Sequence, residues 1–500
     1  MFAKQLKCIY CGEEYDIPRN GEDPRLNNKL MCPKCANIHK WTYGSLDVVY
    51  DYDEIRDKVD LDKIFDFDTP VDTMWGFKDL LPIWSQPVCL GEGDTPFYTC
   101  QRVCEELDVS NLYLKYEGAN PTGSFKDRES SVCVSRALEI GAKGVTCISS
   151  GNAAGSLAAY ASRAGVKCLV FTPSSASPEK MTQIGIFDAE LIAVDGIFED
   201  VWELINRNAA NTGDDQISKL ANLTYQYYYD CNAALNPYRV EGDKTEAYEI
   251  YRNLQNIPDW VVVPTGNGSN LAGIWKGFKE MFNLGIINRL PKLICVQVKG
   301  GDPIAKAFEQ KKDSSVRVEN PPDSIAEGIV ARDCYDATKA LRALRESGGV
   351  TVAVDDLEVI EYMELLAGKE GVFVEPTSAT TLAAVGKLRE TYAIEKSDKI
   401  VCVLTGSGLK ATKEVMVKCK KEVRPVDKVK KSDYITLIKD IAKVAKKQFP
   451  TITIPLASDL LGPPEAAAKP TNGNAGKGGS ANSSSNHSKQ KENNSNKTNS

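Results

Sequence analysis

The sequence predicts an α/β protein built on parallel strands. From Gly91 to about Cys419, apolar stretches of strand length alternate with helical patterns, the order that a parallel sheet with covering helices requires. Four of these stretches run into loops rich in glycine and small polar residues before a helical pattern begins. The 500 residues are 42% hydrophobic and carry a net charge of −7, as expected of a globular protein without a nucleic-acid-binding footprint.

The first strand–loop–helix unit carries a lysine at the start of its helix. Residues 112–116 predict a strand that leads into a turn at Gly123, and Ser124 with Asp127 is typical of a capping box. Lys126 then lies in the first helical turn, where the positive end of the helix dipole favours the neutral amine that attacks a carbonyl. For this stretch alone, a solvated lysine after a loop is the alternative interpretation.

The other three units place small polar groups after the predicted strands 144–148, 260–264 and 400–404. The loops that follow these strands are Ser149-Ser150-Gly151-Asn152, Thr265-Gly266-Asn267-Gly268-Ser269-Asn270 and Thr405-Gly406-Ser407-Gly408. Loops at the carboxyl ends of parallel strands bind ligands, and successive amides at a helix N-terminus form an anion site. One glycine-rich loop is more often a tight turn, whereas four in order, one of them with Lys126, indicate a cofactor site.

These loops resemble those of the fold-type II pyridoxal-phosphate enzymes, and among them the threonine synthases, over roughly residues 85–415. Further strings that carry the resemblance are Gly91-Glu92-Gly93-Asp94-Thr95-Pro96, Asn236-Pro237-Tyr238-Arg239-Val240-Glu241-Gly242, Glu375-Pro376-Thr377-Ser378-Ala379 and Leu404-Thr405-Gly406-Ser407-Gly408-Leu409-Lys410. The resemblance implies two open twisted α/β domains, the smaller spanning about 130–225, with pyridoxal 5′-phosphate in the cleft between them.

The resemblance also implies a role for each matching position. Lys126 would form a Schiff base with the cofactor and act as the general base, and Thr405 would face the pyridine nitrogen as a neutral partner. Asn152 would bind the cofactor's 3-hydroxyl, while Ser149, Ser150 and Gly151 would take the substrate carboxylate. The cofactor phosphate would be bound by Gly266, Asn267, Gly268, Ser269 and Asn270, and the substrate phosphate by Asn236 and Arg239.

For a threonine synthase the implied reaction is the conversion of O-phosphohomoserine and water to threonine and phosphate, by γ-elimination and β-addition. Two positions depart from the family pattern: Ser407 stands where histidine is usual, and Ala153 where threonine is usual. Three alternatives stay open. They are a threonine or serine dehydratase, a β-replacing synthase such as a cysteate or cysteine synthase acting on phosphoserine, and a non-catalytic regulatory homologue.

The positions of the histidines limit the catalytic chemistry that is possible in the α/β body, residues 91–420. The chain has two histidines, His39 in the N-terminal segment and His487 near the C-terminus. A Ser-His-Asp or Cys-His hydrolase and a histidine-rich catalytic metal site are therefore excluded from the body. Lysine must carry the proton chemistry.

Two CxxC pairs near the N-terminus, Cys8 with Cys11 and Cys32 with Cys35, have the spacing of a zinc ribbon. Four thiolates leave no open position on the metal, so the predicted zinc is structural. A redox CxxC and unligated thiols are the alternatives. The other eleven cysteines are scattered and are expected to be buried free thiols in a reducing compartment.

Composition divides the chain into a zinc-ribbon-like module at 1–45, an extension at 46–90, the α/β body at 91–420, a basic amphipathic helix with a linker at 421–461 and a disordered tail at 462–500. The N-terminus has no hydrophobic signal core, and no run of about eighteen apolar residues occurs. We therefore expect a cytoplasmic protein with neither membrane nor nucleic acid as a partner. The resemblance implies a small phosphorylated amino-acid substrate and a homodimer.

Overall fold

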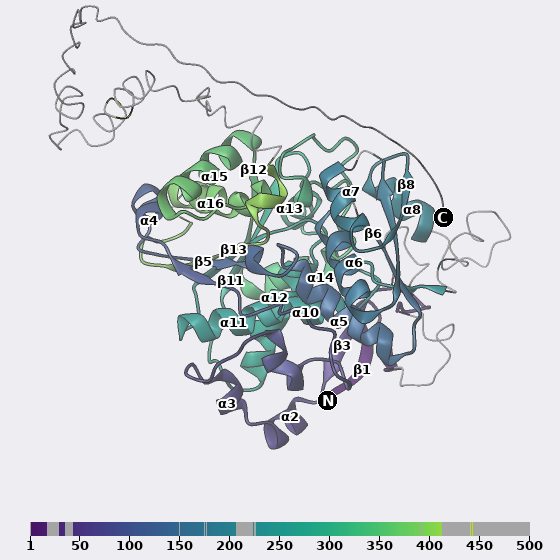
Figure 1. Cartoon of the computed structure of the whole chain (residues 1–500). Helices are drawn as coiled ribbons and strands as arrows, with labels where there is room; N and C mark the ends of the chain where they lie inside the picture. The colour runs from purple at the N-terminus through teal and green to yellow at the C-terminus, as the bar shows by residue number, and fades with distance from the viewer. Residues whose placement is uncertain are drawn as a thin grey trace, which may run out of the picture. The chain divides into compact units, whose positions relative to one another are not determined.

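The computed structural model describes residues 2–17, 30–35, 44–149, 151–174, 178–206, 227–391 and 393–412, with the single residues 176, 224, 441 and 443. The chain divides into two compact units, residues 1–421 and 422–500. In the second unit only Ile441 and Lys443 are described, so the predicted amphipathic helix and the predicted disordered tail lie outside the described residues. The fold below is that of the first unit (Figure 1).

A six-stranded sheet forms the centre of this unit. Its strands, in spatial order, are β12 (Val350–Val354), β11 (Lys292–Val298), β10 (Trp260–Pro264), β13 (Lys399–Leu404), β5 (Asn111–Tyr116) and β4 (Phe97–Thr99). All neighbours are parallel except β4, which pairs antiparallel with β5 at the edge. Every residue of β10 is buried, which explains why the strand is a continuous apolar run in the sequence.

Helices cover both faces of this sheet. Val261 and Val263 of β10 belong to one hydrophobic core, and Val262 between them belongs to another, because successive side chains of a strand point to opposite faces. The first core includes α11 (Thr245–Leu254), α12 (Ser269–Asn283), α13 (Pro303–Glu309) and α14 (Ala337–Ser347). The second includes α4 (Arg102–Leu107), α15 (Asp356–Glu370) and α16 (Pro376–Glu390) (Figure 1). The predicted α/β class is confirmed.

A second, four-stranded sheet is entirely parallel. Its strands, in spatial order, are β8 (Glu190–Val194), β7 (Lys167–Pro173), β6 (Gly144–Ile148) and β9 (Tyr229–Asp230). The helices of this part are α5 (Lys126–Glu139), α6 (Asn152–Ala164), α7 (Pro178–Gly185) and α8 (Phe198–Asn206). Both sheets therefore present the carboxyl ends of parallel strands, where loops collect ligand-binding groups.

The N-terminal segment forms a small antiparallel sheet with the order β2 (Glu14–Asp16), β1 (Ala3–Cys8) and β3 (Leu46–Tyr50). The chain then continues through α2 (Tyr52–Lys58), α3 (Leu61–Phe65) and a 3-10 helix η1 (Met74–Leu80). The Tyr50 hydroxyl donates to Glu241 of α10 (Arg239–Asp243) at 2.6 Å, and Lys276 of α12 forms an ion pair with Asp47 at 2.7 Å. The segment is thus attached to the body by buried polar contacts.

Two further predictions can be compared with the described residues. Fourteen cysteines in this part of the chain have free thiols, and Cys147, Cys168 and Cys402 are buried as expected. None of the helices in the described ranges combines the length and the apolar character that a membrane span needs.

Candidate active site

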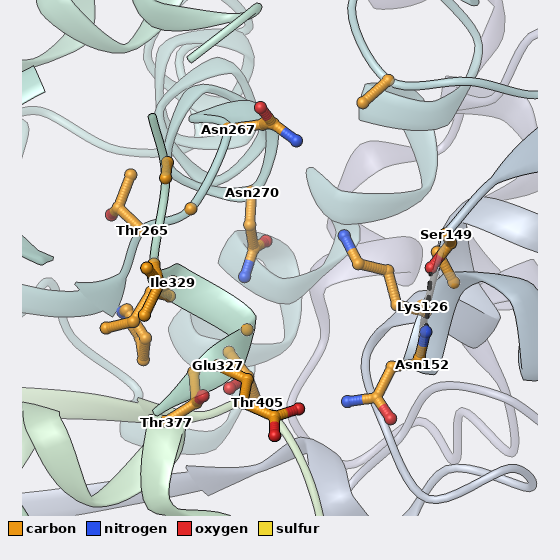
Figure 2. Close-up of a pocket in the computed structure, with 18 of the residues that line it drawn as sticks. Lys126, Ser149, Asn152, Thr265, Asn267, Asn270, Glu327, Ile329, Thr377 and Thr405 are labelled. Carbon is orange, nitrogen blue, oxygen red and sulfur yellow. Dashed lines mark hydrogen bonds between the residues drawn. The ribbon is translucent and has the colours of Figure 1, made fainter. Parts of the chain in front are cut away.

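Loops from both sheets line one cavity of about 250 Å³. They follow strands β5, β6, β10 and β13, the four strands whose loops the sequence singled out. Lining residues that the sequence predicted are Lys126, Ser149, Gly151, Asn152, Arg239, Gly266, Asn267, Gly268, Ser269, Asn270 and Thr405. In Figure 2 the amine of Lys126 points toward the wall that Asn267 and Asn270 form.

The turn before α5 is built differently from the predicted capping box. Lys126 is the first residue of α5, but Phe125 is the N-cap and no side chain caps this helix. Asp127 instead accepts hydrogen bonds from the amide and the hydroxyl of Thr122, both at 2.6 Å, and from the Ser156 hydroxyl of α6 at 2.6 Å. The capping-box prediction is wrong because the aspartate is recruited by the preceding turn and by a neighbouring helix.

Lys126 is not the solvated surface lysine of the alternative interpretation. Its side chain is 18% exposed, and its Nζ lies 2.7 Å from Glu129 Oε1, one helical turn further along α5. The other oxygen of Glu129 accepts from the guanidinium of Arg239, and this carboxylate is 2% exposed. Burial disfavours the charged carboxylate, but the positive charges of Arg239 and Lys126 outweigh it and hold the pKa of Glu129 below its ordinary value.

The loop after β10 approaches its neighbours too closely for side chains at its glycines. A Cβ on Gly266 would lie 2.7 Å from the carbonyl oxygen of Gly328, and Gly268 has a φ of +103° at the N-cap of α12. The side-chain oxygen and nitrogen of Asn270 are buried, with no hydrogen-bond partner in the described part of the chain. Residues 266–270 all line the cavity, so the N-terminus of α12 lies where an anion would bind.

Asn152 and Thr405 both line the cavity, and both contact residues at the start of α16, whose N-cap is Glu375. The Asn152 amide donates to the two oxygens of Glu375 at 3.1 and 3.0 Å, whereas Asn152 Oδ1 is buried without a partner among the described residues. The Thr405 hydroxyl lies 3.2 Å from that of Ser378. Burial raises the pKa of Glu375. The sequence motif around Glu375 predicts no role for this residue, because its partner Asn152 lies 223 residues away in the sequence.

The predicted substrate-binding residues do not all reach the cavity. Arg239 lines it, donates to the Cys231 carbonyl at 2.6 Å and keeps a buried Nε without a partner in the described part of the chain. Asn236 does not line the cavity: its side chain donates to the Asp230 carbonyl and accepts from the Tyr238 amide, which shapes the turn before α10. Ser150 lies outside the described residues.

The two departures from the family pattern have different places. Ala153 lines the cavity, whereas Ser407 is absent from its lining. The Ser407 hydroxyl accepts from the Leu409 amide as the N-cap of the 3-10 helix η4 (Gly408–Lys410). Charged lining groups for which the sequence predicted no role are Lys180, Glu199, Glu327, Asp333 and Glu375.

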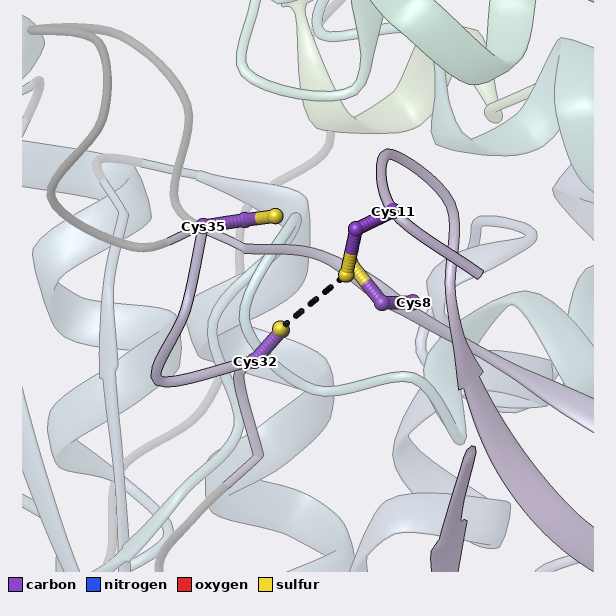
Figure 3. Close-up of side chains that lie close together, drawn as sticks. All are labelled: Cys8, Cys11, Cys32 and Cys35. Atoms are coloured by element: carbon purple, nitrogen blue, oxygen red, sulfur yellow. Dashed lines mark hydrogen bonds between the residues drawn. The ribbon is translucent and has the colours of Figure 1, made fainter. Parts of the chain in front are cut away.

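The four cysteines of the N-terminal segment come together as the sequence predicts (Figure 3). Their sulfur atoms all lie within 4.8 Å of one another, and Cys11 Sγ is 3.7 Å from Cys32 Sγ. The cysteines come from two separate turns, one after β1 and one at residues 32–35. Four thiols at this separation match the donor set and the compactness of a tetrahedral metal site.

This cysteine cluster contacts the helix behind the glycine loop. Cys8 pairs with Leu46 across strands β1 and β3, and Lys339 of α14 donates to the Leu46 carbonyl at 2.9 Å. At the start of the same helix, the Asp336 amide donates to the Asn267 carbonyl at 3.1 Å. These contacts connect the cysteine cluster, through α14, to Asn267 in the lining of the cavity.

Comparison with known proteins places these features in a family. The family model "Pyridoxal-phosphate dependent enzyme" matches residues 88–406. A threonine synthase of Methanocaldococcus jannaschii is 40% identical over 408 residues, which are 81% of this chain and 92% of that protein. A threonine synthase of Methanosarcina acetivorans is 37% identical over 416 residues, 83% of this chain and 94% of that protein.

Solved structures agree on the fold. Maize serine racemase superposes with a TM-score of 0.54 at 22% identity, covering 65% of this chain and 92% of that one. A fungal L-serine ammonia-lyase from Rhizomucor miehei superposes with a TM-score of 0.53 at 19% identity, covering 68% of this chain and 100% of that one. At these identities the likeness concerns the fold alone.

Proposed function

The chain belongs to the pyridoxal-phosphate-dependent enzyme family, and we propose that it converts O-phosphohomoserine and water to L-threonine and phosphate. The observation that carries the proposal is one cavity lined by Lys126, Asn152, the glycine loop and Thr405, in a chain that matches threonine synthases over more than nine-tenths of their length. The alternatives within the fold are a dehydratase and a β-replacing synthase.

The cavity has the groups that pyridoxal phosphate needs. Buried polar atoms of Asn152 and Asn270 lack partners in the described part of the chain, as groups do when a ligand completes their hydrogen bonds. The amides from Gly266 to Asn270 would hold the cofactor phosphate, Asn152 its 3-hydroxyl, and Lys126 its aldehyde carbon. Thr405 would give the ring nitrogen a neutral partner, which disfavours transamination.

When bound, the cofactor supplies an electron sink that acidifies the C–H bonds of the amino-acid substrate. Lys126 is the base placed to use this acidity, since residues 44–412 contain no histidine. Three protons would be released, from Cα, from Cβ and from the adding water, and three would be taken up, by the departing phosphate, by Cγ and by Cα. The Lys126 Nζ would carry the protons to and from carbon one at a time. Because each proton transfer to or from carbon starts or ends at Lys126 Nζ, the reaction depends on where this nitrogen is held and on which charged group lies beside it.

The substrate phosphate requires positive charge, because a desolvated dianion must be paired. Arg239 and Lys180 line the cavity, and the buried Nε of Arg239 offers a donor. Glu129 already balances part of the charge on Arg239. We therefore assign the substrate phosphate to Arg239, with Lys180 and amide donors beside it. Asn236 would act indirectly, by shaping the turn that places Arg239.

We further propose that Cys8, Cys11, Cys32 and Cys35 hold a structural zinc ion. The proposal is supported by the sulfur separations, by the four-thiol donor set and by the absence of any fifth candidate ligand from this cluster of described residues. The domain boundaries, the homodimer and the cytoplasmic location stay predictions.

Product analysis tests the proposed reaction. Incubation of the cofactor-loaded protein with O-phosphohomoserine is expected to release phosphate and threonine in equal amounts. Lys126→Arg keeps the cation beside Glu129 but has no amine that can form a Schiff base, and it is expected to be inactive. A 2-oxo acid as the product, or turnover of phosphoserine alone, would replace the proposal with one of the alternatives.

A further inference from the structure

Glu129 is the one carboxylate in the described part of the chain that forms an ion pair with Lys126. It lies one turn after the lysine on the same helix, so rigid helical geometry sets their separation. At 2.7 Å, with Lys126 18% and Glu129 2% exposed, this contact is a partly buried charge-assisted hydrogen bond rather than a surface pair. The charge of Glu129 is therefore felt at the nitrogen that the proposed reaction uses.

A second element fixes Glu129 in place. Arg239 at the start of α10 binds its other oxygen, so the carboxylate cannot follow Lys126 when the lysine side chain moves. The side chains of Lys126, Glu129 and Arg239 together carry a net charge of +1 when the lysine amine is protonated, and no net charge when the amine is neutral. The ion pair of Glu129 with Arg239 thus stays balanced in both states of the lysine.

The remaining titratable groups around Glu129 do not compete for this role. Asp243 of α10 is fully buried, and burial with the charge of Glu129 raises the pKa of Asp243 well above its ordinary value. Asp336 before α14 is also buried, and burial raises its pKa. Of these three carboxyl groups, Glu129 is the one that forms an ion pair with Lys126.

We propose that Glu129 is a positioning residue that holds Lys126 Nζ and stabilises its ammonium form between proton transfers. This rests on the proposed function, in which Lys126 takes each proton from carbon and must hold it until the next acceptor is in place. The proton moves from carbon to Nζ and back, and Glu129 accepts a hydrogen bond from Nζ without being protonated itself. A neutral residue at this position would let the ammonium lose its proton too readily.

Glu129→Gln tests the proposal, and α5 offers a matched control. Arg136 and Glu139 form a second buried ion pair with the same three-residue spacing and the same 2.7 Å separation, and Glu139 does not line the cavity. Glu139→Gln therefore removes an equivalent buried charge elsewhere on the helix. Glu129→Asp keeps the charge on a shorter side chain and serves where the glutamine variant fails to fold.

The first measurement needs no substrate. The rate at which the apo-protein attaches pyridoxal phosphate is followed by visible absorbance across pH, because only the neutral amine of Lys126 reacts. In Glu129→Gln the midpoint of this profile is expected to move to lower pH by about one unit, the size of shift that a neighbouring opposite charge produces. Glu139→Gln is expected to keep the wild-type midpoint, and Glu129→Asp to lie between the two.

The second measurement is turnover of O-phosphohomoserine. Glu129→Gln is expected to lower kcat by about tenfold to a hundredfold, within the range of general acid–base effects. An unchanged attachment profile, or the same loss of kcat in both glutamine variants, would overturn the role of Glu129. A shifted attachment profile in a protein that forms no threonine would support the role of Glu129 and overturn the proposed function.

Discussion

Gly266→Ala tests how the cavity holds an anion. The added Cβ would lie 2.7 Å from the Gly328 carbonyl oxygen, a backbone atom that cannot rotate away, so the loop must shift. Overpacking of this kind costs about 1–3 kcal/mol. If the cost falls on the loop conformation that binds the cofactor phosphate, affinity for pyridoxal phosphate drops about fivefold to a hundredfold, at about 1.4 kcal/mol per factor of ten.

The assay for Gly266→Ala is titration of the apo-protein with pyridoxal phosphate, read by visible absorbance and paired with a thermal melt. Gly368→Ala is the control, because a Cβ there meets nothing within 4 Å and the residue lies on the exposed side of α15. Its affinity should equal that of the wild type. Wild-type affinity in Gly266→Ala would refute the assignment of this loop to the cofactor phosphate.

Three further predictions follow from the contacts around the cavity. Asn152→Ala removes both hydrogen bonds to Glu375 and should weaken pyridoxal-phosphate binding by about tenfold, the effect of roughly one or two net hydrogen bonds; unchanged affinity would contradict its role. Cys32→Ser should lower both the melting temperature and the affinity for the cofactor, because the cysteine cluster contacts the helix that binds the Asn267 carbonyl; loss of zinc with neither effect would contradict this coupling. Burial raises the pKa of Asp127 to about 6. The free energy of unfolding should therefore be highest below pH about 4, where this carboxyl is neutral in both states. It should fall by about 3 kcal/mol as the pH rises from about 4 to about 6. Asp127→Asn should remove that part of the pH dependence between pH 4 and 6, as measured by urea unfolding, and an unchanged pH dependence would contradict the assignment.

The strands and loops of the cavity could be predicted because their signals are local. Fully buried parallel strands such as β10 leave continuous apolar runs, and the glycines after them are required by close backbone contacts that only glycine permits. The cysteine pairs have a spacing that few other sites use. For these features the sequence around each residue is sufficient.

Contacts between distant segments could not be predicted in the same way. Asp127 matched a capping box locally, but Thr122 and Ser156 offered it better partners in the folded protein. The ion pair of Glu129 with Arg239 and the hydrogen bonds of Asn152 with Glu375 join positions 110 and 223 residues apart. No periodicity or composition relates such positions, so these parts of the site become visible only when the strands are placed side by side.

The central claim is that water adds to the carbon chain of O-phosphohomoserine as its phosphate leaves. The most direct test is turnover by the cofactor-loaded protein in water enriched in heavy oxygen, with mass spectrometry of both products and Lys126→Arg as the blank. The account predicts threonine that carries the label in its hydroxyl group and phosphate that is unlabelled, with neither product from the variant. Labelled phosphate with homoserine, or a 2-oxo acid in place of threonine, would contradict it.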